Sequence, residues 1–439
     1  MVAGMVGCGG NAGGGVQRGA SDTTCDGKID GPTYITVWFH GAPDPRDPSV
    51  SERDTLEEQV AAFNRSQREV RVRLVTLPRG DYNRQVRAAA ASGSLPDVLD
   101  LDGPYLYNYA WSGKLKPLGS CVPQRLLGDL LPSIRGQGTY AGRLWGLGTF
   151  DSGLGLYVRP SVLRKVGARL PTDPGDAWSA AEFTDILHRL RRAGYRRPLD
   201  LKLNYLSSTP EWAAYGFAPA VWSAGGDLVD RHDYRKADGV MNGSEAVEAL
   251  TTIQHWVSDG LVDPNRDDAA FVKRRSPISW VGHWLYPSYS EALLGDLAIV
   301  PLPDFGRGTV TGMGSWQWGI TANTTDGDAA WRFLEFLLQP QQVRRMSTAN
   351  GGIPATVSVA RSSETFGPGG AEHLFLQQLQ DGIARPRPQT PAYPAITAAF
   401  GTAVREIFAG RPVKPALDAA ANRVDEDLDA HQGYPAPEP

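Results

Sequence analysis

The sequence contains little cysteine, no long hydrophobic run and no excess of positive charge. Its 439 residues include 3 cysteines and carry a formal net charge of -4 at pH 7. This balance argues against nucleic acid or an anionic membrane surface as the main partner. No stretch of about 20 consecutive apolar residues occurs, so no membrane-spanning helix is expected. The length exceeds what one hydrophobic core normally supports, and we therefore expect two domains.

Motifs of common catalytic and cofactor sites are also missing. The chain has no Gly-x-Ser-x-Gly, no His-Glu-x-x-His and no Walker loop, and its 7 histidines are scattered. We therefore expect no metal and no cofactor. A weak dinucleotide motif that begins at Gly136 falls in a turn region rather than after a strand. Glycoside hydrolysis stays open as an alternative, because Asp100, Asp102 and Asp151 could supply the two carboxylates that it needs.

The N-terminal residues are typical of an exported, anchored protein. Cys8 follows a glycine and several small apolar residues, as at the end of a bacterial lipoprotein signal, although the positive part and most of the apolar part are missing. The following run to Gly31 is rich in Gly, Ser, Asn and Asp, as in a flexible tether. We predict that residues 1–32 are a signal remnant and tether, that Cys8 carries a lipid anchor, and that the protein lies on the extracellular face of a bacterial membrane. A disordered, tag-like tail is the alternative.

The two other cysteines then form a possible pair. An exported protein would oxidise Cys25 and Cys121, and the bridge would fix the end of the tether to the first domain. Two free, buried thiols are the alternative.

The first hundred residues alternate between strand and helix patterns. β-Branched and aromatic residues predict strands, and apolar residues at helical spacing predict helices between them. The strands are expected at 33–39, 70–77 and 95–102, and the helices at about 52–65 and 82–92. This order is typical of a parallel sheet with helices on its faces. Ligands of such sheets bind beyond the carboxyl ends of the strands, which places His40, Asp100, Asp102 and Tyr105–Tyr109 at one rim.

The rest of the chain continues this alternation and predicts a second lobe. Further helices are expected at 180–193, 211–222, 245–259, 328–338 and 395–428, and further strands at 153–159 and 297–302. We predict that the chain crosses between two α/β lobes near Asp151, Pro301 and Asn350. Lobe 1 would hold 33–150 plus 301–345, and lobe 2 would hold 151–300 plus 346–439. A hinge of several strands lets such lobes close over a ligand.

Two short, glycine-broken segments carry paired tryptophans. Trp280 and Trp284 lie either side of Gly282, and Trp316 and Trp318 follow Gly314. Flat rings can cover the apolar faces of a pyranose, and carboxylates accept hydrogen bonds from its hydroxyls. These residues predict a sugar site in a cleft, with a place in the core as the alternative for each ring. The candidate site residues are His40, Asp81, Asp100, Asp102, Tyr105, Asn108, Phe150, Asp151, Tyr215, Trp280, His283, Trp284, Gly314, Ser315, Trp316 and Trp318.

Several short motifs, each weak alone, occur in an order that is characteristic of one family. They are Leu95–Val98, Trp111–Leu118, Gly146–Gly148 followed by Leu156-Tyr157, Ala224–Gly226, Trp280–Trp284 and Gly314–Ile320. With these motifs, the chain from about 33 to 425 resembles the extracellular solute-binding proteins of carbohydrate ABC importers, of the maltose-binding type.

The resemblance implies a fold and a function. The implied fold has two Rossmann-like α/β lobes joined by a multi-strand hinge, the periplasmic-binding-protein type II fold. The implied function is a monomeric receptor, not an enzyme. It would capture a mono- or oligosaccharide, with a maltodextrin as one option, and deliver it to the membrane permease subunits of an ABC importer.

The resemblance also implies roles for single residues. Tyr215 and Trp284 would stack on the sugar, and Asp151 would contact it from the hinge. The family has a tryptophan early in the first-lobe binding loop, where this chain has Leu101, and the nearby Asn108-Tyr109 would compensate. A binder of another polar solute, such as a polyol phosphate or a peptide, is the alternative. A phosphate would require Arg or Lys at the rim, and the candidate loops hold few.

Overall fold

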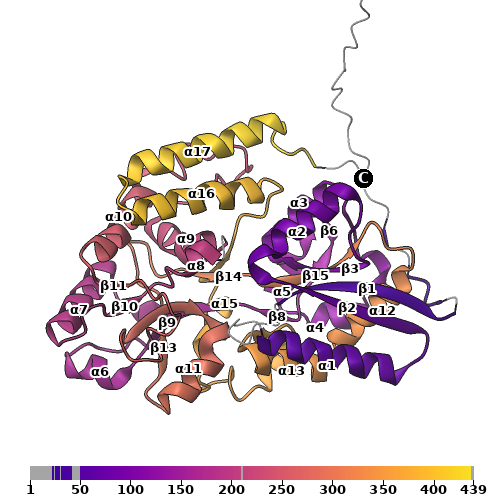
Figure 1. Cartoon of the computed structure of the whole chain (residues 1–439), viewed down its shortest axis with the longest axis horizontal. Coiled ribbons are helices and arrows are strands. Elements are labelled where there is room, and N and C mark those ends of the chain that lie inside the picture. Colours follow the sequence, from indigo (N-terminus) through magenta and orange to yellow (C-terminus); the bar gives the residue numbers. More distant parts are fainter. Residues whose placement is uncertain (1–21, 24, 30, 42–49, 209–210, 437–439) are drawn as a thin grey trace, which may run out of the picture.

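Two separate β-sheets define two lobes in the computed structural model, which describes residues 22–23, 25–29, 31–41, 50–208 and 211–436 (Figure 1). The sheet of lobe 1 has the strand order β2-β1-β3-β15-β4, and β7 also pairs with β15. The sheet of lobe 2 has the order β11-β10-β12-β9-β13. The predicted two-lobed α/β fold is confirmed.

Lobe 1 is built on the predicted strand–helix–strand–helix–strand unit. Strands β1 (Thr33–His40), β2 (Val70–Leu77) and β3 (Val98–Asp102) are parallel. The third strand starts later than predicted, because Pro96 has no N–H and the Asp97 carboxylate accepts the backbone N–H of Thr36 at 2.8 Å. The remaining elements of this lobe are α1 (Val50–Ser66), α2 (Arg79–Ser92), η1 (Gly103–Tyr105), α3 (Leu106–Trp111), β4 (Leu115–Lys116), η2 (Gly119–Cys121), α4 (Gln124–Asp129), α5 (Pro132–Gln137), β5 (Thr139–Tyr140), β6 (Arg143–Leu144), β7 (Gly146–Leu147), β15 (Trp316–Thr321), α12 (Gly327–Leu337) and α13 (Pro340–Asn350).

Lobe 2 begins after the first crossing and ends the chain. Strands β10 and β11 are parallel, whereas β9 runs antiparallel to both β12 and β13. Its elements are β9 (Leu154–Val158), α6 (Pro160–Lys165), η3 (Pro174–Asp176), α7 (Ala180–Arg192), β10 (Leu199–Asp200), α8 (Tyr205–Ser208), α9 (Trp212–Ala224), α10 (Ser244–Ser258), β11 (Val262–Asp263), β12 (Ile278–Gly282), η4 (His283–Leu285), α11 (Tyr286–Leu293), β13 (Ala298–Val300), α16 (Tyr393–Phe408) and α17 (Val413–Ala430).

Local sequence signals set several helix ends. Ser179 caps the start of α7, since its hydroxyl accepts the N–H of Glu182 at 3.1 Å, and Asp326 caps α12, since its carboxylate accepts the N–H of Ala329 at 2.8 Å. Gly225 follows the end of α9, and its φ is 99°, a conformation that side chains disfavour. A glycine at this position therefore ends the helix.

Two of the three crossings lie elsewhere than predicted. The first lies at β8 (Phe150–Asp151), which pairs with β16 (Ile353–Pro354). The second lies at Gly314 rather than Pro301, because the segment up to β14 (Thr311–Met313) still packs on lobe 2, where the Thr311 hydroxyl donates to the carbonyl of Leu154 at 2.6 Å.

The third crossing lies after α14 (Val357–Arg361) rather than near Asn350. The N–H of Ser358 donates to Asp129 of lobe 1 at 2.9 Å. Lobe 2 resumes with α15 (His373–Gln380), where Phe375 lies beside Tyr157, and with β17 (Ala384–Pro386), which pairs with β14. The predicted lobe limits at 301 and 345 therefore shift to 314 and about 361.

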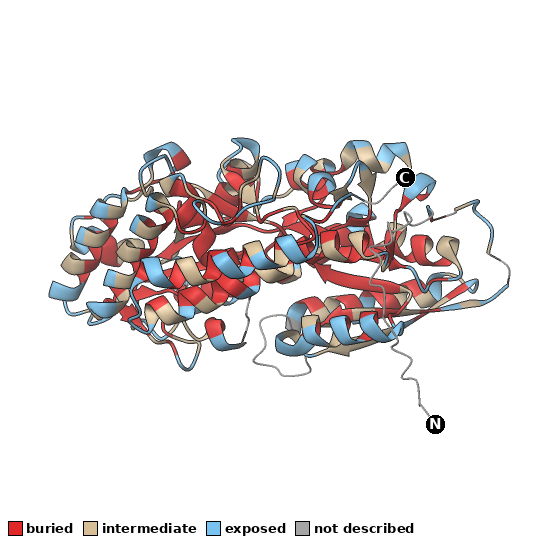
Figure 2. Ribbon diagram, turned by 90° about the horizontal axis from the view of Figure 1, so that it is seen from above, coloured by how far each residue is buried: buried red, intermediate tan, exposed pale blue. Residues whose placement is uncertain are grey.

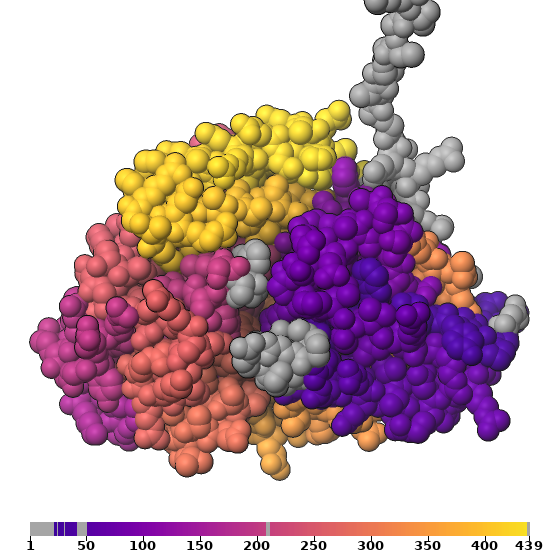
Figure 3. All heavy atoms as spheres, in the orientation of Figure 1, coloured from indigo at the N-terminus to yellow at the C-terminus, as the bar shows by residue number. Residues whose placement is uncertain are grey.

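The buried residues lie on the strands and on the inward faces of the helices in both lobes (Figure 2). The two C-terminal helices, yellow in Figure 3, cover lobe 2 and extend toward lobe 1. After α17 the chain contacts lobe 1 itself, because Trp111 packs against Tyr434 with ring centroids 4.8 Å apart. None of the helices in the described part of the chain has the length and apolar character needed to cross a membrane.

The N-terminal segment is attached to lobe 1 by a disulfide between Cys25 and Cys121, whose Cα atoms are 5.0 Å apart. Nearby, the N–H of Thr23 donates to the carbonyl of Pro117 at 2.9 Å. The predicted lipid anchor, Cys8, lies outside the described residues.

Loss of this disulfide is expected to destabilise the chain. It joins residues 96 apart in the sequence, so the double variant Cys25→Ser/Cys121→Ser is expected to lower the free energy of unfolding by about 2–4 kcal/mol. Urea unfolding with and without reductant measures the change. Reductant should destabilise the wild-type chain and leave the double variant unchanged; equal stability of the two proteins would contradict the expectation.

Candidate functional site

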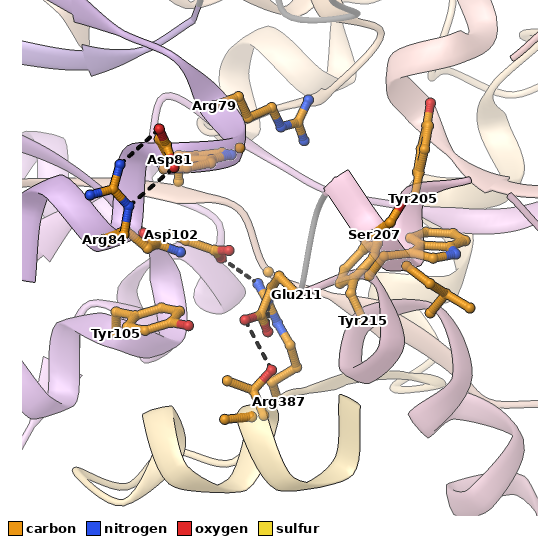
Figure 4. Close-up of a pocket in the computed structure, with 18 of the residues that line it drawn as sticks. Arg79, Asp81, Arg84, Asp102, Tyr105, Tyr205, Ser207, Glu211, Tyr215 and Arg387 are labelled. Carbon is orange, nitrogen blue, oxygen red and sulfur yellow. Dashed lines mark hydrogen bonds and ion pairs between the residues drawn. The ribbon is translucent and has the colours of Figure 1, made fainter. Parts of the chain in front are cut away.

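A cavity of about 1290 Å3 lies between the two lobes. Residues that follow strands or begin helices form its walls, because these are the points where the backbone leaves each sheet (Figure 4). The lobe 1 wall consists mainly of the start of α2, Asp102 and Tyr105. The lobe 2 wall consists mainly of α8, the start of α9, Trp284 and one face of α16. Phe150, Ser152 and Gly314–Trp316 line the cavity at the hinge.

Aromatic rings from both lobes line this cavity. In lobe 2, Trp284 packs edge-on against Trp212, with ring centroids 6.1 Å apart, and at an angle against Tyr215, with centroids 5.9 Å apart. In lobe 1, Trp316 lines the cavity at the first position of β15. The indole nitrogen of Trp284 is buried and has no hydrogen-bond partner among the described residues. The cavity therefore offers apolar ring faces from both lobes.

A buried histidine supports Trp316 from behind. The His40 ring stacks on the Trp316 indole with centroids 3.5 Å apart and 8° between the planes. Its Nδ1 lies 2.5 Å from a carboxylate oxygen of Asp100, and its Nε2 lies 3.1 Å from Glu52. Burial alone would lower the pKa of His40, but the two carboxylates raise it above its ordinary value. The His40 ring, itself held by two carboxylates, therefore holds the indole in a fixed orientation.

One arginine joins acids from the two lobes beside the cavity. The guanidinium of Arg387 lies 2.8 Å from Asp102 of lobe 1 and 2.8 Å from Glu211 of lobe 2, and Figure 4 shows it between them. Its side chain is only 4% exposed, and its central carbon lies 5.2 Å from the centre of the Tyr215 ring. This ion-pair group links the two walls directly.

A buried lysine orients an acid on the lobe 2 wall. Lys202 is fully buried, and its Nζ lies 2.9 Å from Asp268, which lines the cavity. Lys202, Asn265 and Asp268 all have positive φ values, of 52°, 46° and 51°. Such conformations are costly for residues other than glycine and tend to gather at functional sites. The strained backbone thus presents the Asp268 carboxylate to the cavity.

The family model of the bacterial extracellular solute-binding proteins matches residues 58–366, which is more than half of the chain. The chain belongs to this family.

Known proteins similar to this solute-binding protein share its fold at low sequence identity. The acarbose-binding GacH receptor of Streptomyces glaucescens is 20% identical, with a TM-score of 0.75 over 91% of this chain and 98% of that one. The cyclic alpha-maltosyl-1,6-maltose binding protein of Arthrobacter globiformis is 24% identical, with a TM-score of 0.72 over 91% and 100%. A solute-binding protein of Thermotoga lettingae, solved with alpha-D-tagatose, is 20% identical, with a TM-score of 0.74 over 90% and 100%.

A Streptomyces antibioticus protein described as an uncharacterized lipoprotein in the oleD 5' region is 22% identical over 328 residues, which cover 68% of this chain and 66% of that protein. The solute-binding chain therefore spans slightly less than two thirds of this relative's length.

Ten of the candidate site residues line the cavity of this solute-binding protein. They are Asp81, Asp102, Tyr105, Phe150, Tyr215, His283, Trp284, Gly314, Ser315 and Trp316. The sequence placed most of them after strands or in glycine-broken loops and Tyr215 in a predicted helix, and the fold brings these positions together. Their roles in binding stay predictions.

Two of the predicted tryptophans lie in the core instead. Trp280 is fully buried, packs near Phe217, and donates its indole N–H to the carbonyl of Gly216 at 3.0 Å. Its position in the middle of β12 explains this, since the strand is covered on both faces. Trp318 stacks on Phe39 with centroids 5.9 Å apart. It shares a sheet face with Trp316 but lies two residues further from the rim.

Four predicted polar residues support the site rather than line it. Asp100 and His40 form the buried pair behind Trp316. Asn108 donates to the carbonyl of Pro391 at 2.8 Å, so it ties α3 to the segment before α16. Asp151 is fully buried and accepts the N–H groups of Ser152 at 2.7 Å and Gly314 at 3.1 Å. It therefore joins the first and second crossings instead of facing a ligand.

Sequence reasoning missed most of the charged lining. We expected few basic residues near the site, but six arginines line the cavity: Arg79, Arg84, Arg87, Arg266, Arg387 and Arg405. None of these arginines lies in an aromatic or glycine-rich loop, and those loops were the features from which the site was predicted. Glu211 and Trp212 begin a predicted helix and could have been found from that position, whereas Arg387 lies in a proline-rich segment without any pattern.

The different environments of Trp280 and Trp284 predict different stability effects. Trp280→Ala is expected to lower the free energy of unfolding by about 3–5 kcal/mol, because it empties a fully enclosed volume. Trp284 is only partly buried, so Trp284→Ala should cost clearly less. Urea unfolding of both variants measures the difference, and an equal loss in the two would contradict the assignment of Trp280 to the core.

Glu211 is expected to make stability depend on pH. Burial raises the pKa of Glu211 to about 7, against the opposing effect of Arg387, from an ordinary value of 4.5. Between these two values the folded state binds more protons than the unfolded state, so the free energy of unfolding falls as the pH rises through this range. Glu211→Gln removes that contribution. Urea unfolding at several pH values checks this, and the same pH profile in both proteins would contradict it.

Proposed function

We propose that this solute-binding protein captures a mono- or oligosaccharide between its lobes and delivers it to the permease of an ABC importer. The observation that supports this is the pairing of ring faces with fixed polar groups in one cavity. Trp284 and Tyr215 line it from lobe 2, and Trp316 lines it from lobe 1. A pyranose has two apolar faces and a rim of hydroxyls, so it matches rings on its faces and ionised groups at its edge.

The similar proteins of known structure support the same class of ligand. Those described above were solved with acarbose and with alpha-D-tagatose, or are described as binding a cyclic maltosyl-maltose. These ligands belong to those proteins. For this chain, the cavity volume of about 1290 Å3 leaves room for several sugar units.

A glycoside hydrolase is the alternative that we considered, and the acids proposed for it are poorly suited to catalysis. Asp100 is paired with His40 and Asp102 with Arg387, while Asp151 accepts backbone N–H groups in the hinge. A hydrolase needs one protonated acid and one free carboxylate on either side of the scissile bond. We therefore propose that the chain binds its ligand without catalysis.

We further propose that the protein acts as a monomer on the outer face of the cell membrane, attached through a lipid on Cys8. The extracellular character of the family and the lipoprotein description of the Streptomyces antibioticus relative support this. Metabolic labelling with a fatty acid tests it, with Cys8→Ser as the control that should lose the label.

Calorimetric titration with a sugar panel tests the proposed function. The panel contains glucose, maltose, maltotriose, a cyclic maltosyl-maltose and tagatose, and a chromogenic glycoside is assayed in parallel. Heat from at least one sugar without cleavage of the glycoside is expected. Cleavage without any binding heat would favour the hydrolase.

Removing one ring of the cavity should weaken sugar binding. Trp284→Ala is expected to raise the dissociation constant at least about tenfold, because it removes a flat apolar surface from the cavity wall. Tyr34→Ala is the matched control, since Tyr34 is 78% exposed on β1 and does not line the cavity. Unchanged affinity in Trp284→Ala would show that this indole only supports the fold.

A further inference from the structure

Three of the arginines that line the cavity have no bonded partner. The guanidinium groups of Arg79, Arg87 and Arg266 form no hydrogen bond or ion pair with any residue that the structure describes. Arg79 and Arg87 belong to α2 of lobe 1, and Arg266 belongs to the loop after β11 of lobe 2. Positive charge therefore enters the cavity from both walls.

The acids that line the cavity are, by contrast, already paired. Each has at least one hydrogen-bond or ion-pair partner within the protein, and these partners reduce what it can offer to a ligand. The partners are Arg387 for Asp102 and Glu211, Arg84 for Asp81, Lys202 for Asp268, Arg275 for Asp267, His40 for Glu52 and Tyr434 for Asp427. These carboxylates are therefore engaged with groups of the protein, whereas the guanidinium groups of Arg79, Arg87 and Arg266 remain available to a ligand.

Arg79 is the best placed of the three arginines. Figure 4 shows its guanidinium extending from lobe 1 into the cavity, on the side that faces Tyr205. Arg79 is half-buried, whereas Arg87 and Arg266 are exposed. Burial raises the pKa of Tyr205 and lowers that of His283, and the charge of Arg79 acts to lower both. The charge of Arg79 thus acts across the cavity on groups of lobe 2, and in its own lobe it helps to lower the pKa of Glu52.

We infer that the cavity selects an acidic saccharide, whose carboxylate or phosphate is bound by Arg79. This inference rests on the proposed sugar-binding function and narrows its ligand class. A guanidinium binds a carboxylate or a phosphate through two parallel charge-assisted hydrogen bonds, which are stronger than those to a neutral hydroxyl. A neutral sugar would offer Arg79 only hydroxyl oxygens as acceptors, and these form weaker hydrogen bonds with a guanidinium. Arg87 and Arg266 would add attraction at the rim without direct pairing.

Titration with matched pairs of sugars tests this selection. Glucose is compared with glucuronate and with glucose 6-phosphate, and galactose is compared with galacturonate. A carboxylate and a phosphate are thereby tested separately as the charged group of the ligand. At least one acidic sugar is expected to bind about tenfold more tightly than its neutral partner. The preference should shrink when NaCl is raised, because salt screens charges near the surface.

The decisive measurement is the ratio of acidic to neutral affinity in variants. Arg79→Gln should lower this ratio to near one, because it removes the guanidinium that binds the carboxylate or phosphate through two hydrogen bonds. Arg192→Gln is the matched control, because it makes the same change of charge on an exposed residue of α7 that does not line the cavity. The control should keep the wild-type ratio.

Two results would overturn the inference while leaving sugar binding intact. One is a neutral sugar that binds as tightly as its acidic partners. The other is an acidic preference that Arg79→Gln leaves unchanged. If no sugar of either kind binds, the proposed function itself fails, and the selection by Arg79 fails with it.

Discussion

The cleft depends on a buried arginine that pairs with one acid from each lobe. A guanidinium that is only 4% exposed is stable only when it is paired and hydrogen-bonded. Arg387 meets this requirement with Asp102, which ends β3, and with Glu211, which precedes α9. Because the two acids belong to opposite walls, the pairing also sets the spacing of those walls. The rings that line them are thereby held at a defined separation.

Buried polar groups elsewhere hold the rest of the site in the same way. His40 stacks behind Trp316 and is itself held by two carboxylates. Asp151 joins two of the crossing segments through backbone N–H groups. In each case a polar residue that does not touch the cavity fixes an element that does. A charge without its partner would be costly in these surroundings, so each group has little freedom to move.

This use of the acids has a consequence for ligand choice. Each carboxylate that lines the cavity already pairs with another group of the protein. The guanidinium groups of Arg79, Arg87 and Arg266 do not. A site that looks rich in acids from its composition therefore presents aromatic rings and unpaired guanidinium groups as well. The charged groups that can bind a ligand are those that the fold leaves unpaired. The number of charged residues in the cavity does not show which groups these are.

Local periodicity was enough to predict the alternation of strands and helices, because each element carries its own pattern. It also placed part of the rim, since Asp102 ends a predicted strand and Tyr105 follows that strand. Contacts between distant segments set three further features: Trp280 lies in the core while Trp284 faces the cavity, the second crossing lies at Gly314, and Arg387 belongs to the site. The reason is physical: the facing of a side chain depends on what packs against it, and the partner Asp102 lies 285 residues away from Arg387 in the chain. Local patterns carry no information about contacts at that separation.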